Sequence, residues 1–381
     1  MAKINKNSNV KVKGLEGIIA GQTNISFIDG LKGRLFYRGY SIEDIAENCT
    51  FEEVSYLLIY GKLPNKNELK NFSTTLKRKR ALPKHTIRML HTFTKNMSSM
   101  EALRTVVSSL SSNDKDSRIS SYEEKLDTGL SIIAKMPTIV AYHYRIKNSK
   151  TPIPPNPKLS HAENFLYMLT GKIPDSEGAE VLDKDFVLHA EHGFNASSFS
   201  VRVTVSTLSD VHSAYTTGIG TLKGPLHGGA ATEVLLMLKN IKKPENVSSY
   251  VNKIILSHGR VMGYGHRIYK VYDPRAKILK KMAENLSAKN NNTTYVEIGQ
   301  KLEHMMSDKK NIYPNVDFYS AIVYHNLNLT HELYSPIFAI ARSSGWLAHI
   351  LEQYKNNRLI RPLEEYTGNL NLKFIPISKR K

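Results

Sequence analysis

Four short stretches of the chain place histidine or aspartate beside glycine or proline, and the most distinctive reads G-R-V-M-G-Y-G-H-R-I-Y-K-V-Y-D-P-R over residues 259–275. Gly263 and Gly265 lack a Cβ, so the backbone there can turn sharply and approach a ligand closely. His266 follows directly, and Arg275 comes nine residues later, after a proline. This spacing indicates a site that binds an anion and transfers a proton near neutral pH. A basic surface loop with a structural histidine is the alternative.

A second histidine, His227, lies in the stretch K-G-P-L-H-G-G-A. The Gly-Pro pair ends one helix, and the two glycines that follow allow a tight turn at the start of the next. The positive end of that helix dipole disfavours protonation, so we expect a neutral imidazole. Its N–H would be a good donor to a developing enolate oxygen. The alternative is a histidine that only packs between two helices.

A carboxylate, Asp317, lies in the stretch Y-P-N-V-D-F-Y-S. Its position after proline and asparagine predicts a loop or the first turn of a helix. A charge that suits the helix N-terminus is one interpretation. Because apolar residues flank it, Asp317 is also a candidate base whose pKa is raised by partial desolvation.

Another polar stretch, H-A-E-H-G-F-N, contains His189 and His192, which we expect on one face of a helix. Two histidines without a third ligand nearby are weak evidence for zinc, so a contact to a substrate oxygen is the favoured interpretation. Arg342 and Arg361 are single arginines in apolar surroundings. They would bind carboxylates in a bidentate manner or form structural ion pairs.

The elements that must position these residues are predicted to be almost all helices, because apolar residues recur at three- and four-residue spacing. Asn65 with Glu68, and Ser160 with Glu163, have the capping-box pattern that begins a helix. One hairpin is predicted at residues 24–38, around an Asp-Gly turn. The predicted fold class is therefore mainly α, with one small β-hairpin near the N-terminus.

The composition limits the possible classes of function. The chain has 381 residues, enough for two domains or one large divided domain, and a net charge of +19 that should attract anions. No continuous apolar run is long enough to span a membrane, and the N-terminus lacks the apolar segment of a signal peptide. The single cysteine, Cys49, excludes an internal disulfide framework and a cysteine-cluster metal site. We expect a cytoplasmic protein.

Together, these stretches resemble the citrate synthase family. The shared motifs, in order, are A-E-H-G-F-N-A-S, G-P-L-H-G-G, G-Y-G-H-R-I-Y-K-x-Y-D-P-R, N-V-D-F-Y-S and R-x-x-G-W followed by R-P. The resemblance begins at G-L-E-G-I-I-A, residues 14–20, and ends at Arg361-Pro362, so only the two tails lie outside it. Lys270 is a departure, because some members have arginine there.

The resemblance implies a multi-helical homodimer in which each subunit has a large and a small mobile domain. The large domain would comprise residues 1–228 and 332–381, and the small domain residues 229–331. Three residues would be catalytic in the condensation of acetyl-CoA with oxaloacetate. Asp317 would remove the methyl proton, His227 would stabilise the enol or enolate, and His266 would protonate the oxaloacetate carbonyl.

The resemblance also implies the binding residues. Those for oxaloacetate would be His192, Arg275, Arg342 and Arg361, the last reaching the partner subunit's site. Those for coenzyme A would be Arg260, Val261, Met262, Gly263, Tyr264, Gly265 and Lys270. Neither a metal nor another cofactor would be needed, and neither nucleic acid nor a membrane is an expected partner. Two alternatives are 2-methylcitrate synthase, which uses propionyl-CoA, and a basic helical nucleic-acid-binding protein.

Overall fold

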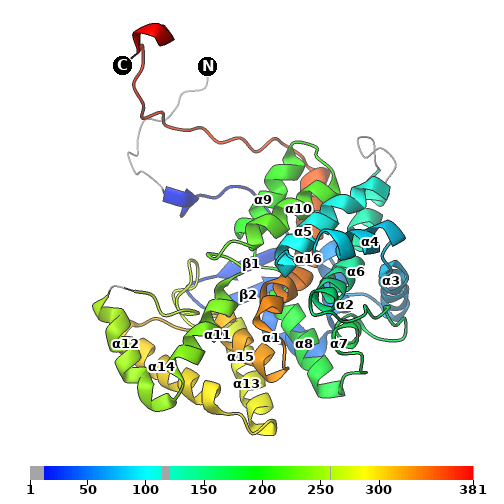
Figure 1. Cartoon of the computed structure of the whole chain (residues 1–381), viewed down its shortest axis with the longest axis vertical. Helices are drawn as coiled ribbons and strands as arrows, with labels where there is room; N and C mark the ends of the chain where they lie inside the picture. Colours follow the sequence, from blue (N-terminus) through cyan, green and yellow to red (C-terminus); the bar gives the residue numbers. More distant parts are fainter. Residues whose placement is uncertain (1–12, 114–120, 258, 381) are drawn as a thin grey trace.

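The computed structural model describes residues 13–113, 121–257 and 259–380, and most of its regular structure is helical (Figure 1). The mainly α fold class predicted from the sequence is confirmed. The α-helices are α1 (Ile42–Asn48), α2 (Phe51–Tyr60), α3 (Lys66–Lys79), α4 (Lys84–Thr92), α5 (Ser99–Ser109), α6 (Tyr122–Lys147), α7 (His161–Thr170), α8 (Ser176–His189), α9 (Ala196–Ser206), α10 (Val211–Leu222), α11 (Ala230–Ile241), α12 (Val247–Leu256), α13 (Pro274–Lys289), α14 (Thr294–Lys310), α15 (Val316–Asn326) and α16 (Tyr334–Lys355). Short 3-10 helices are η1 (Lys13–Leu15), η2 (Leu110–Asn113), η4 (Pro244–Asn246), η5 (His331–Leu333) and η6 (Ile377–Lys379).

Side-chain caps explain where many helices begin. Asn65 and Glu68 form a complete capping box at α3, as do Ser160 and Glu163 at α7, so both sequence predictions are confirmed. Each box satisfies backbone N–H groups that the first helical turn leaves without a partner. Gly61 ends α2 in the left-handed conformation, with φ of 82°, which glycine adopts without steric strain.

The predicted hairpin is present, but it carries a third strand. Strands β1 (Ser26–Asp29) and β2 (Arg34–Tyr37) pair antiparallel, and β3 (Tyr40–Ser41) adds a short antiparallel edge. The tip of the hairpin contacts a segment far away in the sequence, because the Lys270 N–H donates to the Gly30 carbonyl at 2.9 Å. A Cβ on Gly30 would lie 2.4 Å from the Ile268 carbonyl oxygen, so only glycine permits this approach.

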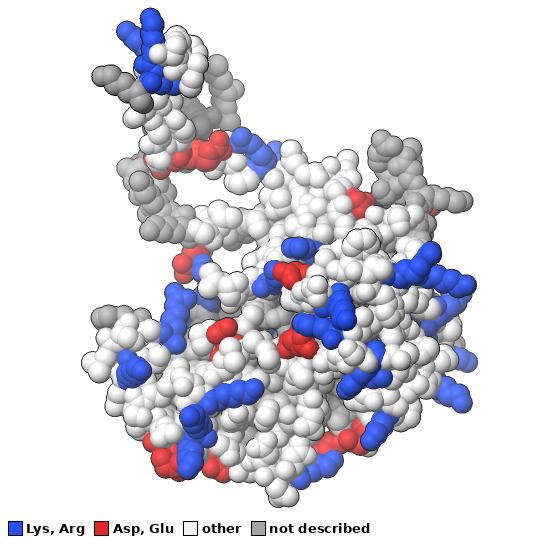
Figure 2. All heavy atoms as spheres, viewed as in Figure 1, with Lys and Arg blue, Asp and Glu red and all other residues white. Residues whose placement is uncertain are grey.

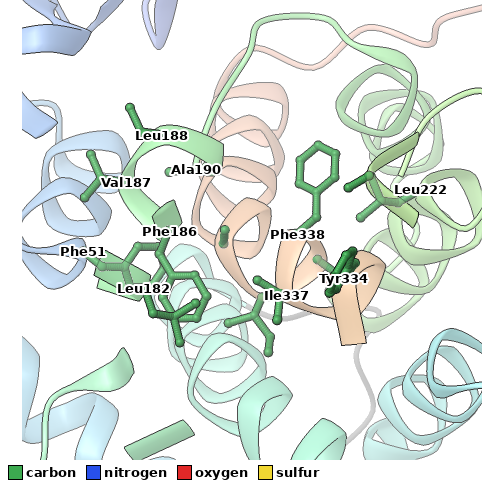
Figure 3. Packing of buried hydrophobic residues seen from close by; sticks show 14 of the residues in the cluster. Phe51, Leu182, Phe186, Val187, Leu188, Ala190, Leu222, Tyr334, Ile337 and Phe338 are labelled. Atoms are coloured by element: carbon green, nitrogen blue, oxygen red, sulfur yellow. The ribbon is translucent and has the colours of Figure 1, made fainter. Parts of the chain in front are cut away.

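The core is organised around α16, whose residues from Tyr334 to Leu351 are almost all buried. Helices α2, α6, α8, α9 and α10 pack around it. Figure 3 shows apolar side chains of α8, such as Phe186, on one side of α16 and Leu222 of α10 on the other. This arrangement places the end of α8 and the start of α11 beside the same buried helix.

A second group of helices lies beside this core (yellow-green to orange in Figure 1), where α11 and α13 pack on α15 and α12 packs on α14. The predicted domain boundaries at residues 228 and 331 remain a prediction. After α16 the chain runs away from the body as an extended, exposed segment. In the described part of the chain, no helix is long and apolar enough to cross a membrane.

Candidate active site

His227 lies in the turn just before α11, as predicted. Its Nε2 atom is hydrogen-bonded to Ser197 Oγ at 2.8 Å, and the Trp346 indole N–H donates to the same hydroxyl at 3.2 Å. One edge of the ring is therefore held by α9 and α16, while Nδ1 makes no hydrogen bond within the described part of the chain. Burial, and then the charge of Arg342, lower the pKa of His227 to about 3. The lowered pKa agrees with the predicted neutral imidazole, but its causes are burial and Arg342 and not the helix dipole named in the prediction.

His266 is also a neutral ring, and its tautomer follows from its contacts. Nδ1 accepts the backbone N–H groups of Ile268 at 3.0 Å and Tyr269 at 3.1 Å. An accepting nitrogen carries no proton, so in the neutral ring the proton is on Nε2. Burial, followed by the charge of Arg275, lowers the pKa of His266 to about 4. The residue thus presents an N–H donor to a ligand.

His192 lies in the loop between α8 and α9. The expectation that it shares a helix face with His189 is wrong, because α8 ends at His189. Its Nε2 atom is hydrogen-bonded to the Tyr269 hydroxyl at 3.2 Å, and its ring meets that of His266 edge-on at 5.1 Å between centroids. Burial and the charge of Arg275 hold the pKa of His192 well below its usual range.

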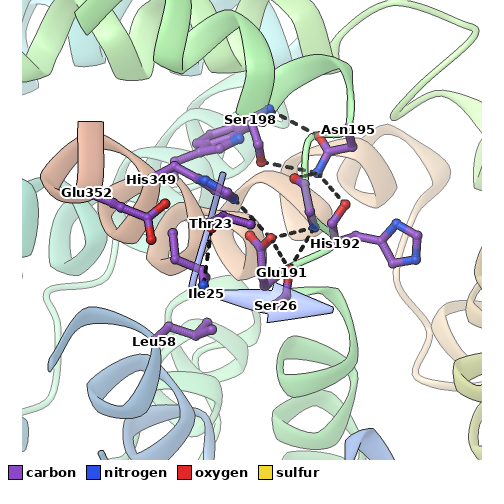
Figure 4. Close-up of polar contacts among 12 residues, drawn as sticks. Thr23, Ile25, Ser26, Leu58, Glu191, His192, Asn195, Ser198, His349 and Glu352 are labelled. Carbon is purple, nitrogen blue, oxygen red and sulfur yellow. Dashed lines mark hydrogen bonds and ion pairs between the residues drawn. The ribbon is translucent and has the colours of Figure 1, made fainter. Parts of the chain in front are cut away.

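The loop that carries His192 is fixed by a buried carboxylate, Glu191 (Figure 4). Its Oε1 atom accepts the Ser26 hydroxyl at 2.9 Å and the Gly193 N–H at 2.5 Å, and it is 3.0 Å from His349 Nε2. The Tyr37 hydroxyl donates to the Glu191 carbonyl at 2.7 Å. The N-terminal hairpin therefore positions the loop, a role that the sequence interpretation missed although Glu191 lies within the same motif.

Arg275 is buried at the start of α13 and forms a bidentate ion pair with Asp273, the N-cap residue of that helix. Its Nε atom donates to Oδ1 at 3.1 Å and Nη2 donates to Oδ2 at 2.7 Å, which leaves Nη1 outside the pair. Burial disfavours the charge, but Asp273 outweighs this effect and the pKa of Arg275 is raised. The D-P-R motif thus supplies both the cation and the carboxylate that orients it.

Arg342 lies on α16 and is 1% exposed. Its Nε atom donates to the His189 carbonyl at 2.7 Å, and the guanidinium lies over the Phe338 ring at 4.9 Å. Nη1 has no hydrogen-bond partner among the described residues. Burial lowers the pKa of Arg342 to about 10, so the group is still a cation. A buried cation with an unpaired N–H group is costly without an anionic ligand.

Asp317 lies in the first turn of α15, as predicted, and is half-buried. Its backbone N–H donates to the side chain of Asn315, the N-cap residue, at 3.1 Å. Burial raises the pKa of Asp317 to about 6, against opposing effects of His189 and then Arg275. The predicted raised pKa is confirmed, and it lies close to the value that a base needs near neutral pH.

The predicted coenzyme A turn pairs with the segment that leads into Asp317. Gly263 and Gly265 have φ of 75° and 79°, in the left-handed region. The Gly263 carbonyl accepts the Asn315 N–H, and the Gly265 N–H donates to Tyr313, both at 2.9 Å. A Cβ on Gly263 would lie 2.8 Å from Phe318 Cβ, so this turn requires glycine.

A cavity of about 190 Å³ lies beside this turn and is bordered by Gly265, His266 and Lys270. Among the other residues predicted to contact coenzyme A, Arg260 is exposed and Met262 and Tyr264 are half-buried. Val261 is buried in the core, so only its backbone is available to a ligand.

Arg361 lies apart from the buried residues of the site. It is exposed on the segment after α16, where Nη1 donates to the Pro362 carbonyl at 3.0 Å and lies 3.6 Å from Glu364. The three predicted catalytic residues and the other three predicted oxaloacetate residues influence or contact one another. The charges of Arg275 and Arg342 affect the pKa values of both His192 and Asp317, and the Phe338 ring is 5.8 Å from that of His227.

This arrangement can remove a proton with a carboxylate, donate hydrogen bonds from two neutral imidazoles and hold an anion with buried guanidinium groups. The fold and site therefore define a helical protein whose site is suited to proton transfer on an anionic substrate. The family description "Citrate synthase, C-terminal domain" matches residues 14–363. The chain belongs to the citrate synthase family.

Individual relatives agree with this assignment. The citrate synthase of Synechocystis sp. is 44% identical over 97% of this chain and 94% of its own length. Citrate synthase 2 of Bacillus subtilis is 43% identical over 97% of this chain and 99% of its own. The 2-methylcitrate synthase 2 of Corynebacterium glutamicum is 39% identical over 97% of both chains. The citrate synthase of Thermoplasma acidophilum, solved as a ternary complex with carboxymethyl coenzyme A and oxaloacetate, superposes with a TM-score of 0.92 and 36% identity over 97% of this chain and 99% of that one.

Proposed function

We propose that this chain condenses acetyl-CoA with oxaloacetate and water to give citrate and coenzyme A, with Asp317, His227 and His266 as its catalytic residues. The observation that carries this assignment is a half-buried carboxylate with a pKa near 6, in one site with two neutral imidazoles. Membership of the citrate synthase family supports the reaction.

In the first step, Asp317 takes a proton from the methyl group of acetyl-CoA while His227 donates a hydrogen bond to the thioester oxygen. A thioester methyl group is a very weak acid, so both effects are needed at once. A positioned general base contributes roughly 10²–10⁴-fold, and one oxyanion donor contributes about 3 kcal/mol. The free Nδ1 edge of His227 is the edge available for this hydrogen bond, because Ser197 holds Nε2.

In the second step, the enolate carbon attacks the carbonyl carbon of oxaloacetate, and His266 transfers its Nε2 proton to the carbonyl oxygen as the C–C bond forms. A proton from water then restores the neutral ring of His266. The tautomer fixed by the backbone of Ile268 and Tyr269 places a proton on that nitrogen. Water then hydrolyses the citryl thioester and releases coenzyme A. Each step uses side chains of this protein, and we propose that no metal or further cofactor takes part.

Oxaloacetate would be held by His192, Arg275 and Arg342, joined by Arg361 of a second subunit. The unpaired Nη1 of Arg342 and the Nη1 of Arg275 supply donors for two carboxylates. Arginine suits this task because its planar donors match a carboxylate.

Coenzyme A would lie along the glycine turn, with Arg260, Met262, Tyr264 and Lys270 around its adenine and phosphates and the backbone of Val261 to Gly265 beneath it. The cavity beside Gly265 and Lys270 supports this placement. Basic side chains are spread over the molecular face in Figure 2, which fits attraction of anionic substrates more than a continuous nucleic-acid groove. We propose that neither nucleic acid nor a membrane is a partner.

We also propose a homodimer in which the segment after α16 lies on the partner subunit. This segment exposes large apolar side chains, including Leu363 at 86% and Phe374 at 82%, and such residues favour a covering surface. It also carries Arg361, which is exposed and contacts only its neighbours Pro362 and Glu364 among the described residues. The proposed small domain, residues 229–331, carries His266 and Asp317, so closure would complete the site. A cytoplasmic location is consistent with the free cysteine, Cys49.

Thiol release from acetyl-CoA in the presence of oxaloacetate tests this function directly. The competing activity is that of a 2-methylcitrate synthase, which uses propionyl-CoA with the same catalytic groups. One methylene changes selectivity by only about 1–3 kcal/mol, so kcat/KM should be measured for both thioesters. A clear preference for propionyl-CoA would replace acetyl-CoA as the substrate, and no thiol release from either would refute the assignment.

A further inference from the structure

One side chain joins the glycine turn before His266 to the helix that carries Asp317. Asn315 is the N-cap residue of α15, and its Oδ1 atom accepts the Asp317 N–H at 3.1 Å. On the other side of the same amide, Nδ2 donates to the Gly265 carbonyl at 2.9 Å. Gly265 immediately precedes His266 in the chain. Asn315 therefore contacts the backbone of both segments that carry the proposed base and acid.

The backbone of Asn315 repeats this division. Its N–H donates to the Gly263 carbonyl at 2.9 Å, and its carbonyl accepts the Phe318 N–H at 3.2 Å. Two groups of Asn315 thus bind the glycine turn, and two bind the first turn of α15. Between them, Tyr264 and Pro314 form an isolated antiparallel bridge. Two segments that lie 50 positions apart in the sequence are in this way joined through one residue.

The two side-chain bonds together require asparagine at this position. A helix cap needs only an acceptor, and in this chain Ser41 caps α1 and Asp210 caps α10. The bond to the Gly265 carbonyl also needs a donor, which an aspartate lacks, and a serine hydroxyl is too short to make both contacts. Among the preferred N-cap residues, asparagine has an acceptor and a donor on one planar group.

The position of Asp317 makes this arrangement important for the proposed chemistry. Asp317 is the second residue of α15, so its placement depends on a closed first turn. We propose that Asn315 is a positioning residue that holds this turn and the turn before His266 as one unit, so that base and acid keep a fixed relation. The inference rests on the roles proposed for Asp317 and His266. A misplacement of about 1 Å in a reacting group can cost roughly 10²-fold in rate.

Two variants of the full-length enzyme separate the two bonds, with thiol release from acetyl-CoA and oxaloacetate as the assay. Asn315→Ser keeps an acceptor for the helix cap and loses the bond to Gly265, whereas Asn315→Ala loses both. We expect kcat to fall about tenfold in the serine variant and roughly 100-fold in the alanine variant. The KM for oxaloacetate should stay within about twofold, because other contacts hold its proposed binding residues.

A double-mutant cycle with Asp317→Asn shows whether Asn315 acts through the base. If it does, Asn315→Ser should lower kcat by less than about threefold when Asp317 is already replaced. An equal loss in both backgrounds would overturn the proposal, because a merely structural role predicts that result. Wild-type kcat in Asn315→Ser would overturn it too, since the helix cap alone would then account for the residue. If Asn315→Ala does not fold, the cycle with the serine variant decides.

A matched control is Asn65→Ser, the same change at the N-cap of α3. The Oδ1 atom of Asn65 accepts the Asn67 N–H at 3.0 Å, as Asn315 does at Asp317. Its kcat and KM should match the wild type, and a loss as large as that of Asn315→Ser would refute a specific role of Asn315. A wild-type enzyme that releases no thiol would instead refute the proposed function itself.

Discussion

The imidazole rings of His192 and His266 meet edge-on, with centroids 5.1 Å apart, although 74 positions separate them in the sequence. Both rings have lowered pKa values because they are buried beside Arg275. Two cationic imidazoles could not share this space at low cost, so the site uses them as neutral hydrogen-bonding groups. Among these three groups, Asp317 is the one that binds a proton near neutral pH, because burial raises its pKa to about 6. Several measurable properties follow from this difference.

Replacing Asp317 by asparagine should remove the base and leave the anion-binding groups in place. We expect kcat to fall by roughly 10²–10⁴-fold, the usual contribution of a positioned general base. The affinity for oxaloacetate, measured by isothermal titration calorimetry, should change by less than about threefold. Normal turnover by Asp317→Asn would show that another group removes the proton.

The acid limb of the pH profile should report Asp317. Its pKa is raised to about 6, and only the ionised form can accept a proton, so kcat/KM should decline as the pH falls below about 6. His227 and His266 should add no second limb above pH 5, because their pKa values are about 3 and 4. A profile of thiol release between pH 4.5 and 9 checks both statements, and a single limb near pH 4 would contradict the first.

Arg342→Gln should weaken oxaloacetate binding more than it changes the chemistry. The variant loses a charge-assisted hydrogen bond, worth about 1.5–3 kcal/mol, so we expect Kd to rise roughly 10–150-fold. Calorimetric titration with oxaloacetate measures the change. Arg145→Gln is a suitable control, because Arg145 donates to the Leu169 carbonyl at 2.8 Å and is remote from the site residues described above. Unchanged oxaloacetate affinity in Arg342→Gln would remove Arg342 from the binding set.

Ser197→Ala should misplace His227, because its hydroxyl joins that ring to Trp346. We expect kcat to fall about tenfold, which corresponds to roughly 1.4 kcal/mol of lost transition-state stabilisation. Ser200→Ala lies on the same helix and does not contact His227, so it serves as the matched control. Equal activity of the two variants would show that Ser197 does not position the imidazole.

A stability prediction concerns His161, the first residue of α7, whose two ring nitrogens are buried and have no hydrogen-bond partner among the described residues. Burial, followed by the charge of Arg80, lowers its pKa to about 3. Below pH 6.5 the unfolded chain binds a proton at this residue and the folded chain does not, so the free energy of unfolding falls as the pH falls. At pH 5 this loss should be about 2 kcal/mol.

Urea unfolding of wild type and His161→Phe at pH 7 and pH 5 measures this effect. The variant lacks the titrating group, so it does not lose this stability. On going from pH 7 to pH 5, its free energy of unfolding relative to wild type should therefore rise by about 2 kcal/mol. His91→Gln replaces an exposed histidine and should run parallel to the wild type. A constant difference between wild type and His161→Phe would contradict the assigned cause.

The sequence was most informative where local chemistry determines local structure. The capping box of Asn65 and Glu68, the turn at His227 and the first-turn position of Asp317 all depend on residues within a few positions of each other. Such patterns are visible without a structure. The short strand β3 was missed because two residues carry too little pattern to predict pairing.

Contacts between distant segments could not be predicted in this way. Glu191 lies in a motif that the sequence interpretation singled out, yet its bonds to Ser26 and His349 depend on how three elements pack. Likewise, nothing near Arg342 in the sequence shows that its Nη1 atom lacks a partner. Motifs indicated the candidate reacting groups, and tertiary packing determines their charge states and orientation.

The contact between the hairpin tip and the His266 segment has a kinetic consequence. Lys270 is joined to Gly30 by one backbone hydrogen bond, across 240 positions of sequence. A movement that separates residues 229–331 from the N-terminal hairpin must break this bond and separate Gly30 from the Ile268 carbonyl. The exchange rate of the Lys270 amide hydrogen would therefore report how often the hairpin tip separates from the His266 segment.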